Sequence, residues 1–415
     1  MHWVWSPVGL LLLLPGPALL ASLLVNDNQF MEWFGQPRFL SPSLKLIALV
    51  NYILLLSISA LASRTSPVSR ATIDLDEHHQ RWLDYSVRCF ATITFGAYAI
   101  WFILAIVRGL NFVTITALVS GDSGAMYILR NDYFGTVGGV TTWMELGVLL
   151  GPLTILRSRA GIRSGSPILV VLFLFALTRA FLNSERLALV EVIVSTLIAC
   201  LALRQEAPKP LLSKARVLVF FILSWVGLIV AFGAFEYFRS WRSQGLSSGR
   251  GFAEFVGTLF FGYYATALNL AAFDNWIMNG QHWLGAMFDG GFYRAIFGVS
   301  PTGDAQGIYG FVTFTNRSGL LTPVNALGFV GSAILWSVIG LLIGKLARQA
   351  SFGGALALAA YCATATGMLE VVRIFYFGSS RFLPIIIGII ALAFSLVFLP
   401  SNEANSLRTR RIGGA

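Results

Sequence analysis

Apolar stretches long enough to cross a bilayer alternate with short polar segments along almost the whole chain. A membrane-spanning helix needs about 20 mostly apolar residues, so this pattern predicts ten spans. They lie near 4–24, 44–61, 87–107, 136–156, 166–183, 187–203, 217–235, 327–347, 354–373 and 382–399. The predicted fold is an all-α polytopic membrane protein, a single transmembrane domain over residues 1–415. The first stretch has no Lys or Arg before it, so we expect it to stay in place as a span.

Positive charges gather in every second connecting segment and so predict the orientation of the spans. The cation-rich segments are 62–86, 157–165, 204–216, 345–353 and the C-terminal tail. Because short cytoplasmic loops are enriched in Lys and Arg, these segments and both termini are predicted to be cytoplasmic. Composition agrees with a membrane protein, since 56% of residues are hydrophobic and only 12% are charged. The net charge of +10 is then explained by membrane anchoring, and nucleic acid is not expected as a partner.

One long polar segment, Glu236 to Asn325, interrupts the apolar pattern and is predicted to form a large outer, periplasmic loop. It contains five arginines, no lysine and many aromatic residues. A guanidinium group binds phosphate through two parallel hydrogen bonds, which an ammonium group cannot do. The loop therefore suggests a site for an anionic, sugar-bearing lipid head group, although an arginine-rich composition and an interfacial aromatic belt would give a similar pattern. Within it, 256–276 is apolar but broken by polar residues, and we expect a re-entrant or interfacial helix.

Ionisable residues inside the apolar stretches are the next candidates, because burying a charge in a membrane is costly. Candidate arginines for binding a diphosphate lie at the predicted outer ends of the spans and in the loop: Arg179, Arg186, Arg250, Arg317, Arg373 and Arg381. Three acids lie within the apolar stretches and could instead pair with these arginines: Glu145, Glu191 and Glu370. An internal ion pair and a ligand contact are both open for Arg179.

Few residues of the loop could act as a general base. The candidates are Asp274, His282 and Asp304, and a base must reach the hydroxyl group that it deprotonates. Partial burial would make Asp274 a better proton acceptor, although it could equally well cap the end of its helix. Neither a metal-binding motif nor a nucleotide-binding fingerprint is found, which favours a reaction without metal or cofactor. The pair His78 and His79 is predicted to be cytoplasmic and solvated.

Four passages resemble the Wzy-type oligosaccharide repeat-unit (O-antigen) polymerases of bacterial inner membranes. They are the arginine turn 183–189, the segment 264–270 with Asp274 after it, the segment 315–331, and the segment 373–384. The span layout and the long outer loop extend the resemblance over most of the chain. One departure is that members of this family often carry an acid just before the Gly-Phe-x-Gly turn, where this chain has Asn325.

The resemblance implies a glycosyltransferase of the bacterial inner membrane that needs neither metal nor cofactor. Its substrate would be an undecaprenyl-diphosphate-linked oligosaccharide, polymerised at the outer face into O-antigen, capsule or exopolysaccharide. Residues expected to contact the sugar or the acceptor are Tyr264, Asn269, Asn316 and Tyr376. Expected partners are the lipid-linked substrate, membrane lipid, a chain-length regulator and a flippase. The alternatives are a flippase of the same lipid-linked glycan, a ligase-like transferase, and a membrane scaffold. The sugar, its linkage and the oligomeric state do not follow from the sequence.

The predicted topology can be checked by labelling single cysteines placed at Ser213 and Ser247. A reagent that does not cross the membrane should label position 247 from outside the cell and leave position 213 unlabelled. The opposite pattern would overturn the predicted orientation.

Overall fold

The computed structural model describes residues 5–64, 76–114, 116, 128–182, 186–203, 251–288 and 316–398, with scattered positions between 223 and 241. The secondary structure in these ranges is all helical, which confirms the all-α prediction for them. The α-helices are α1 (Pro7–Leu13), α2 (Pro15–Leu24), α3 (Asp27–Phe34), α4 (Pro42–Ser63), α5 (Glu77–Val107), α8 (Gly147–Arg159), α9 (Ser166–Leu182), α10 (Arg186–Leu203), α12 (Phe252–Met278), α15 (Thr322–Ser351), α16 (Ala355–Leu369) and α17 (Phe382–Phe398). Short turns of 3₁₀- or π-helix complete them: η2 (Leu129–Tyr133), η3 (Thr141–Leu146), η7 (Leu284–Met287) and η8 (Tyr376–Gly378).

Local sequence signals set several of the helix ends. Ser6 and Ser41 cap α1 and α4 through side-chain oxygens that accept the backbone N–H groups of Gly9 and Leu44. Each is followed by a proline, whose fixed φ and missing N–H suit the first helical turn. A further proline, Pro15, separates α1 from α2, so the first predicted span consists of two short helices.

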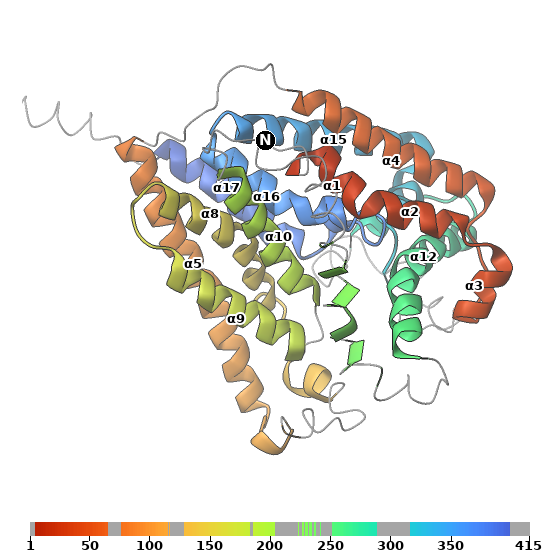
Figure 1. The fold of residues 1–415 in the computed structure, drawn as a ribbon, viewed down its shortest axis with the longest axis horizontal. Coiled ribbons are helices and arrows are strands. Elements are labelled where there is room, and N and C mark those ends of the chain that lie inside the picture. Colours follow the sequence, from red (N-terminus) through yellow and green to blue (C-terminus); the bar gives the residue numbers. More distant parts are fainter. Residues whose placement is uncertain are drawn as a thin grey trace, which may run out of the picture.

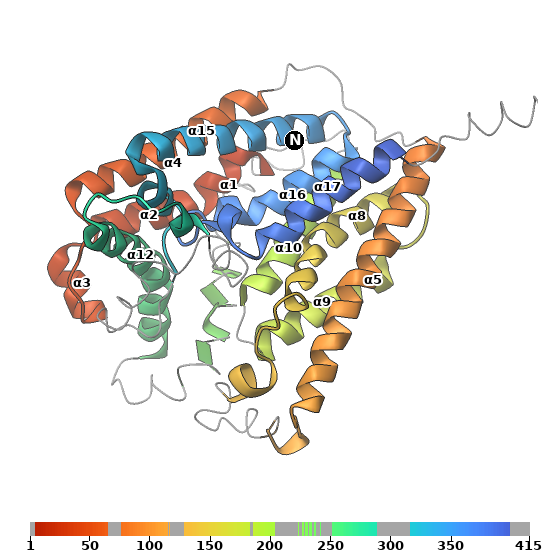
Figure 2. The same ribbon diagram turned by 180° about the vertical axis from the view of Figure 1, so that it is seen from behind.

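Helix α16 forms the centre of the molecule. Every residue from Ala357 to Leu369 is buried, and most of them are alanine, threonine or glycine. Small side chains allow neighbouring helices to approach closely, and α16 packs against α1, α8, α10, α15 and α17. In Figures 1 and 2 it lies between the α4–α15 pair on one side and α5 with α9 on the other.

Gly340 and Gly344, one helical turn apart, bring α15 against α4. A Cβ atom at Gly344 would lie 2.5 Å from Ala62 Cβ and 2.7 Å from the Ser59 carbonyl oxygen. A Cβ at Gly340 would lie 3.1 Å from the Leu55 carbonyl oxygen. These two glycines therefore allow α4 and α15 to pack closely, as small residues do between membrane helices.

The predicted spans agree with the structure only in part. Five helices of the described ranges are long and apolar enough to cross a membrane: Pro7–Leu24 (α1 with α2), Pro42–Ser63, Glu77–Val107, Phe252–Met278 and Thr322–Ser351. Shorter apolar helices accompany them at Ser166–Leu182, Leu187–Leu203, Ala355–Leu369 and Phe382–Phe398. Together they indicate a multi-pass membrane protein. The number of ten spans and their orientation stay predictions.

Two predicted spans are shorter as α-helices than the apolar pattern suggested. In the stretch 136–156 the 3₁₀-helix η3 starts at Thr141, and the α-helix α8 starts only at Gly147. The stretch 354–373 is helical only to Leu369. Consequently Glu370 and Arg373 belong to the connection between α16 and α17, which we call the 370–381 turn.

The segment 256–276 lies within α12, one uninterrupted helix of 27 residues. Its polar residues do not break the helix, and by length and composition it qualifies as a membrane-crossing helix. In both views α12 runs at a steep angle to α4 and α15 (Figures 1 and 2). The prediction of a re-entrant or interfacial helix concerns its placement in the bilayer and stays a prediction. Most of the predicted span 217–235 lies outside the described residues, as does much of the outer loop.

The α4–α15 contact gives a stability prediction. Gly344→Ala should lower the free energy of unfolding by about 1–3 kcal/mol, because the added methyl group has no space between Ala62 and Ser59. Gly96→Ala in α5 is the matched control, since a Cβ there meets nothing within 4 Å and alanine favours the helix. Thermal unfolding of each purified variant in detergent gives the two unfolding midpoints. Equal midpoints for the two variants would contradict the assigned packing.

Candidate functional site

Four charged side chains from different parts of the chain meet inside the helix bundle. Glu145 comes from η3, Arg179 from the end of α9, Glu191 from α10, and Arg381 from the residue before α17. Arg179 Nη2 lies 2.9 Å from Glu145 Oε1, and Arg381 Nη1 lies 3.2 Å from both Glu145 Oε1 and Glu191 Oε2. We call this set the four-charge cluster. The internal ion pair left open for Arg179 is present, and its role in binding a diphosphate stays a prediction.

A second ion pair lies in the 370–381 turn. Arg373 Nη1 is 3.2 Å from Glu370 Oε2, and the Arg373 guanidinium lies 5.5 Å from the centre of the Tyr263 ring on α12. Such a cation–π contact holds the guanidinium plane in a defined orientation. The neighbouring Tyr264 is buried against the same pair. The turn is thereby joined to α12.

A third ion pair fixes the end of α12 to the segment before α15. The Arg317 guanidinium is hydrogen-bonded to the Asp274 carboxylate through Nε and, at 3.4 Å, through Nη2. Next to it, Asn275 Nδ2 donates to Asn325 Oδ1 at 3.0 Å, and Asn325 Nδ2 donates to the Ala271 carbonyl at 2.9 Å. Asn325 stands where the resemblance would place an acid. Here its amide serves to bridge α12 and α15.

His282 lies beside a kink in α15. Gly328 has a φ of 70°, which favours glycine because a side chain is strained there. A Cβ at this position would come within 3.0 Å of His282 Nε2. The segment carrying His282 is anchored by a hydrogen bond from the Trp283 N–H to the Asn325 carbonyl oxygen, 3.2 Å long. The imidazole itself is exposed.

Close backbone contacts bring these segments together around the 370–381 turn. A Cβ at Gly319 would collide with the carbonyl oxygens of Val371 and Ile374, and a Cβ at Gly378 would collide with that of Met287. The segments carrying Arg317, His282, Arg373 and Arg381 therefore pack directly on one another. Each of the three arginines is held by a buried carboxylate and keeps part of its own side chain exposed, with 26% for Arg317, 21% for Arg373 and 19% for Arg381. An arrangement of this kind can bind an anion without movement of the cations.

The other predicted site residues differ in their burial and in the hydrogen bonds that they already make. Asn269 is buried and fully engaged, since it accepts the Phe39 N–H at 2.6 Å and donates to the Pro37 carbonyl at 3.0 Å. Tyr376 is buried next to Glu191, whereas Asn316 is half-buried. Arg250 and Asp304 lie outside the described residues, as does the side chain of Arg186, which begins α10. The sequence predicted no contact for Asn275 or Tyr263, and it singled out Asn325 only as a departure from the family pattern. No spacing signal relates residues so far apart in the chain.

An apolar groove of about 500 Å³ runs between α4 and α15. Leu54 and Ile58 of α4 line it together with Phe329, Ile334, Ser337 and Leu341 of α15. Phe329 directly follows the Gly328 kink, so the groove begins next to His282. An apolar groove and a polar, cationic site are thus adjacent.

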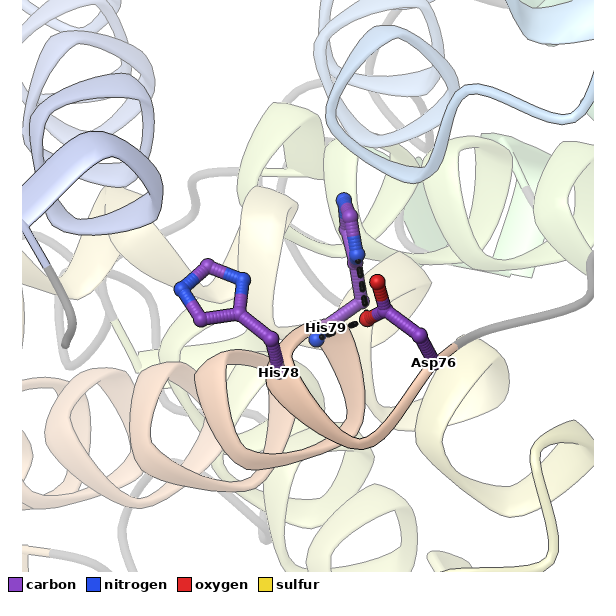
Figure 3. Close-up of side chains that lie close together, drawn as sticks. All are labelled: Asp76, His78 and His79. Atoms are coloured by element: carbon purple, nitrogen blue, oxygen red, sulfur yellow. Dashed lines mark hydrogen bonds and ion pairs between the residues drawn. The ribbon is translucent and has the colours of Figure 1, made fainter. Parts of the chain in front are cut away.

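A separate polar group caps the N-terminus of α5. Asp76, His78 and His79 present metal-ligand atoms within 4.8 Å of one another, but the His78 ring points away from the other two residues (Figure 3). Asp76 accepts the His79 N–H at 2.8 Å and contacts His79 Nδ1 at 2.7 Å. The backbone hydrogen bond from His79 lowers the pKa of the exposed Asp76 carboxyl. These contacts fit a helix cap, the ordinary role of an aspartate at this position.

The four-charge cluster gives a stability prediction. Glu145→Ala should lower the free energy of unfolding by about 3–5 kcal/mol, because it removes an acidic partner from the buried Arg179 and from the partly exposed Arg381. Arg88→Ala is the matched control: this arginine also pairs with an acid, Asp84, but is 57% exposed, and its loss should cost about 1 kcal/mol or less. The free energy of unfolding of both variants is measured in the same detergent. A smaller loss of unfolding free energy in Glu145→Ala than in Arg88→Ala would contradict a structural role for Glu145.

No protein family, curated protein or solved structure matches this chain. A function for the site must therefore be argued from its own geometry and from the resemblance of the short passages described above.

Proposed function

We propose that this protein is a glycosyltransferase that polymerises undecaprenyl-diphosphate-linked repeat units at the outer face of the inner membrane. One observation carries the proposal: Arg317, Arg373 and Arg381 lie partly exposed on segments that pack together, and each is held by a buried acid. A diphosphate leaving group develops negative charge as its bond to the sugar breaks. Preorganised cations stabilise such charge without having to reorganise during the reaction.

The reaction proceeds by attack of an acceptor hydroxyl oxygen on the anomeric carbon of the donor glycan. The carbon–oxygen bond to the diphosphate breaks, and the lipid diphosphate leaves with the bonding electrons. The hydroxyl proton passes to a base of the protein. Energy comes from the diphosphate linkage, and the products are a lengthened lipid-linked glycan and undecaprenyl diphosphate.

In this proposal His282 is the base, and Asp274 orients Arg317. The Asp274 carboxylate is buried, and its oxygens already accept hydrogen bonds from the Arg317 guanidinium. The His282 imidazole is exposed and lies next to the kink at Gly328. An exposed imidazole can approach an acceptor sugar and accept its hydroxyl proton.

The groove between α4 and α15 supports a lipid-linked substrate. Its lining is almost entirely hydrocarbon, and it begins at Phe329, next to the polar site. A polyprenyl tail in this groove would place its diphosphate near the arginines. A flippase for the same lipid would also use arginines, but it has no need of a base beside them.

The arginines can be tested with purified protein and a lipid-linked repeat unit. Arg373→Ala and Arg381→Ala should each lower the rate of polymer formation about 100-fold or more, by removal of transition-state charge stabilisation. Lysine at either position should restore little activity, because it lacks the planar fork. Arg348→Ala, an exposed arginine at the far end of α15, is the control and should keep the parental rate. Parental rates for both site variants would refute the proposed diphosphate site.

The same assay separates the two candidate bases. His282→Ala should bind the donor as the parental protein does. It should form polymer at least about 100-fold more slowly, because the base is missing. Polymer formation at the parental rate by His282→Ala, together with its loss in Asp274→Asn, would assign the base to Asp274 instead.

A strain that lacks this protein separates a polymerase from a flippase. Single repeat units should accumulate on the outer face of the membrane; accumulation on the inner face would indicate a flippase.

A further inference from the structure

A polar groove of about 520 Å³ lies against the first turns of α5. Its lining includes charged residues of α5 and an apolar residue of the turn after α8: Glu77, Arg81, Asp84, Arg88 and Ile162. The four charged positions are spaced by four, three and four residues, so they follow one face of the helix. The groove lies near the end of α8, whereas the four-charge cluster lies near its start. It is therefore separate from the candidate site.

One carboxylate in this groove holds two guanidinium groups. Asp84 Oδ1 lies 2.8 Å from Arg157 Nη2, and Asp84 Oδ2 pairs with Arg88 Nη2. Arg157 comes from the last turn of α8 and is buried, whereas 57% of the Arg88 side chain is exposed. The buried Nε of Arg157 has no hydrogen-bond acceptor in the described part of the chain. Among the described residues, one negative charge thus faces two positive charges.

The other acid of the lining lies too far along the helix to balance this charge. Glu77 is eleven residues before Arg88, about 16 Å along the helix axis. Interactions between exposed charges are largely screened beyond about 10 Å at 0.1 M salt. Arg81 lies between the two and brings a further guanidinium group to the lining. The end of the groove at Arg88 therefore attracts anions.

Arg88 and Arg157 stand where their helices change from polar to apolar. After Arg88, α5 contains no charged residue before its C-cap, Arg108, and α8 contains none before Arg157. Helix α5 is also long and apolar enough to cross a membrane. Arginines at the end of such an apolar stretch lie at the level of the lipid head groups. Lipid phosphates are therefore the anions closest to this end of the groove.

Three segments predicted to be cytoplasmic meet around the groove. The contact between Asp84 and Arg157 joins segment 62–86 to segment 157–165. Trp82 Nε1 donates to Ser395 Oγ at 2.9 Å, which places the start of α5 beside the end of α17, just before the C-terminal tail (Figure 2). Cation-rich segments that meet at one end of a helix bundle attract anionic lipids.

We propose that this groove binds the head group of an anionic phospholipid, with the lipid phosphate on Arg88. The phosphate supplies the second negative charge that Asp84 does not provide for the two arginines. Because Arg88 pairs with Asp84 through Nη2 and is more than half exposed, the rest of its guanidinium can bind phosphate oxygens. The bound head group would neutralise the joint between α5 and α8. This inference is independent of the proposed glycan transfer.

Lipid binding to the delipidated full-length protein in detergent tests the proposal. The protein is titrated with phosphatidylglycerol, which is anionic, or with phosphatidylcholine, which has no net charge, and native mass spectrometry counts the bound lipids. The parental protein should bind phosphatidylglycerol about tenfold more tightly than phosphatidylcholine, as expected for charge-assisted hydrogen bonds. Arg88→Gln should remove this preference. Thermal unfolding verifies that the variant is folded.

Arg348→Gln is the matched control, because it removes the same charge from an exposed arginine in another segment predicted to be cytoplasmic. Its preference for phosphatidylglycerol should equal that of the parental protein. No preference in the parental protein, or an unchanged preference in Arg88→Gln, would overturn the proposal. An equal loss in Arg348→Gln would also overturn it, since surface charge in general would then attract the lipid.

Inorganic phosphate distinguishes a lipid from a free anion at the same arginines. It should fail to displace phosphatidylglycerol when both are present at equal concentration, because the acyl chains hold the head group at the membrane surface. Displacement at equal concentration would identify a soluble phosphate as the ligand and would refute the assignment to a lipid.

Discussion

The candidate site depends on the pairing of arginines with carboxylates that are almost completely removed from solvent. A buried charge is tolerated only with a counter-charge and hydrogen bonds in good geometry, because the desolvation cost is several kcal/mol for each ion. Glu145, Glu191, Glu370 and Asp274 each meet this condition through an arginine from another element or from the adjoining turn. These pairs fix the ends of α9, α12 and α16 relative to one another. The arginines are thus positioned before any ligand arrives.

Small residues provide the second constraint, since the ion pairs meet only if the helices approach closely. Gly340 and Gly344 seat α15 on α4, and the alanine-rich α16 lets neighbours gather around it. Gly319 and Gly378 allow backbone carbonyls of neighbouring segments to lie where a side chain would otherwise stand. Such packing limits the movement of the arginines, because closely packed protein interiors have low compressibility.

The arginines and acids of the site differ in how far their side chains are exposed. Arg179 is buried and serves the cluster, whereas Arg317, Arg373 and Arg381 combine an internal carboxylate with an exposed portion. Asp274 is bonded to Arg317, and the exposed His282 lies in a segment anchored to Asn325. The proposed transfer of a glycan from a diphosphate would use the partly exposed arginines and the imidazole, with the acids as their support.

The sequence by itself determined that the chain is helical and apolar, and it identified the charged residues that are costly to bury. Hydropathy over 20 residues is a local property, so α4, α5 and α15 were predictable, and the acids and arginines stood out against their apolar surroundings. Helix ends at Leu369 and the 3₁₀ start at Thr141 were not predictable, because they depend on packing against distant segments. Only the tertiary structure decided which acid meets which arginine, since Glu145 and Arg381 are 236 residues apart. It also decided that Asp274 binds Arg317 while His282 stays exposed, because the partner of a side chain depends on the approach of separate helices and not on its neighbours in sequence.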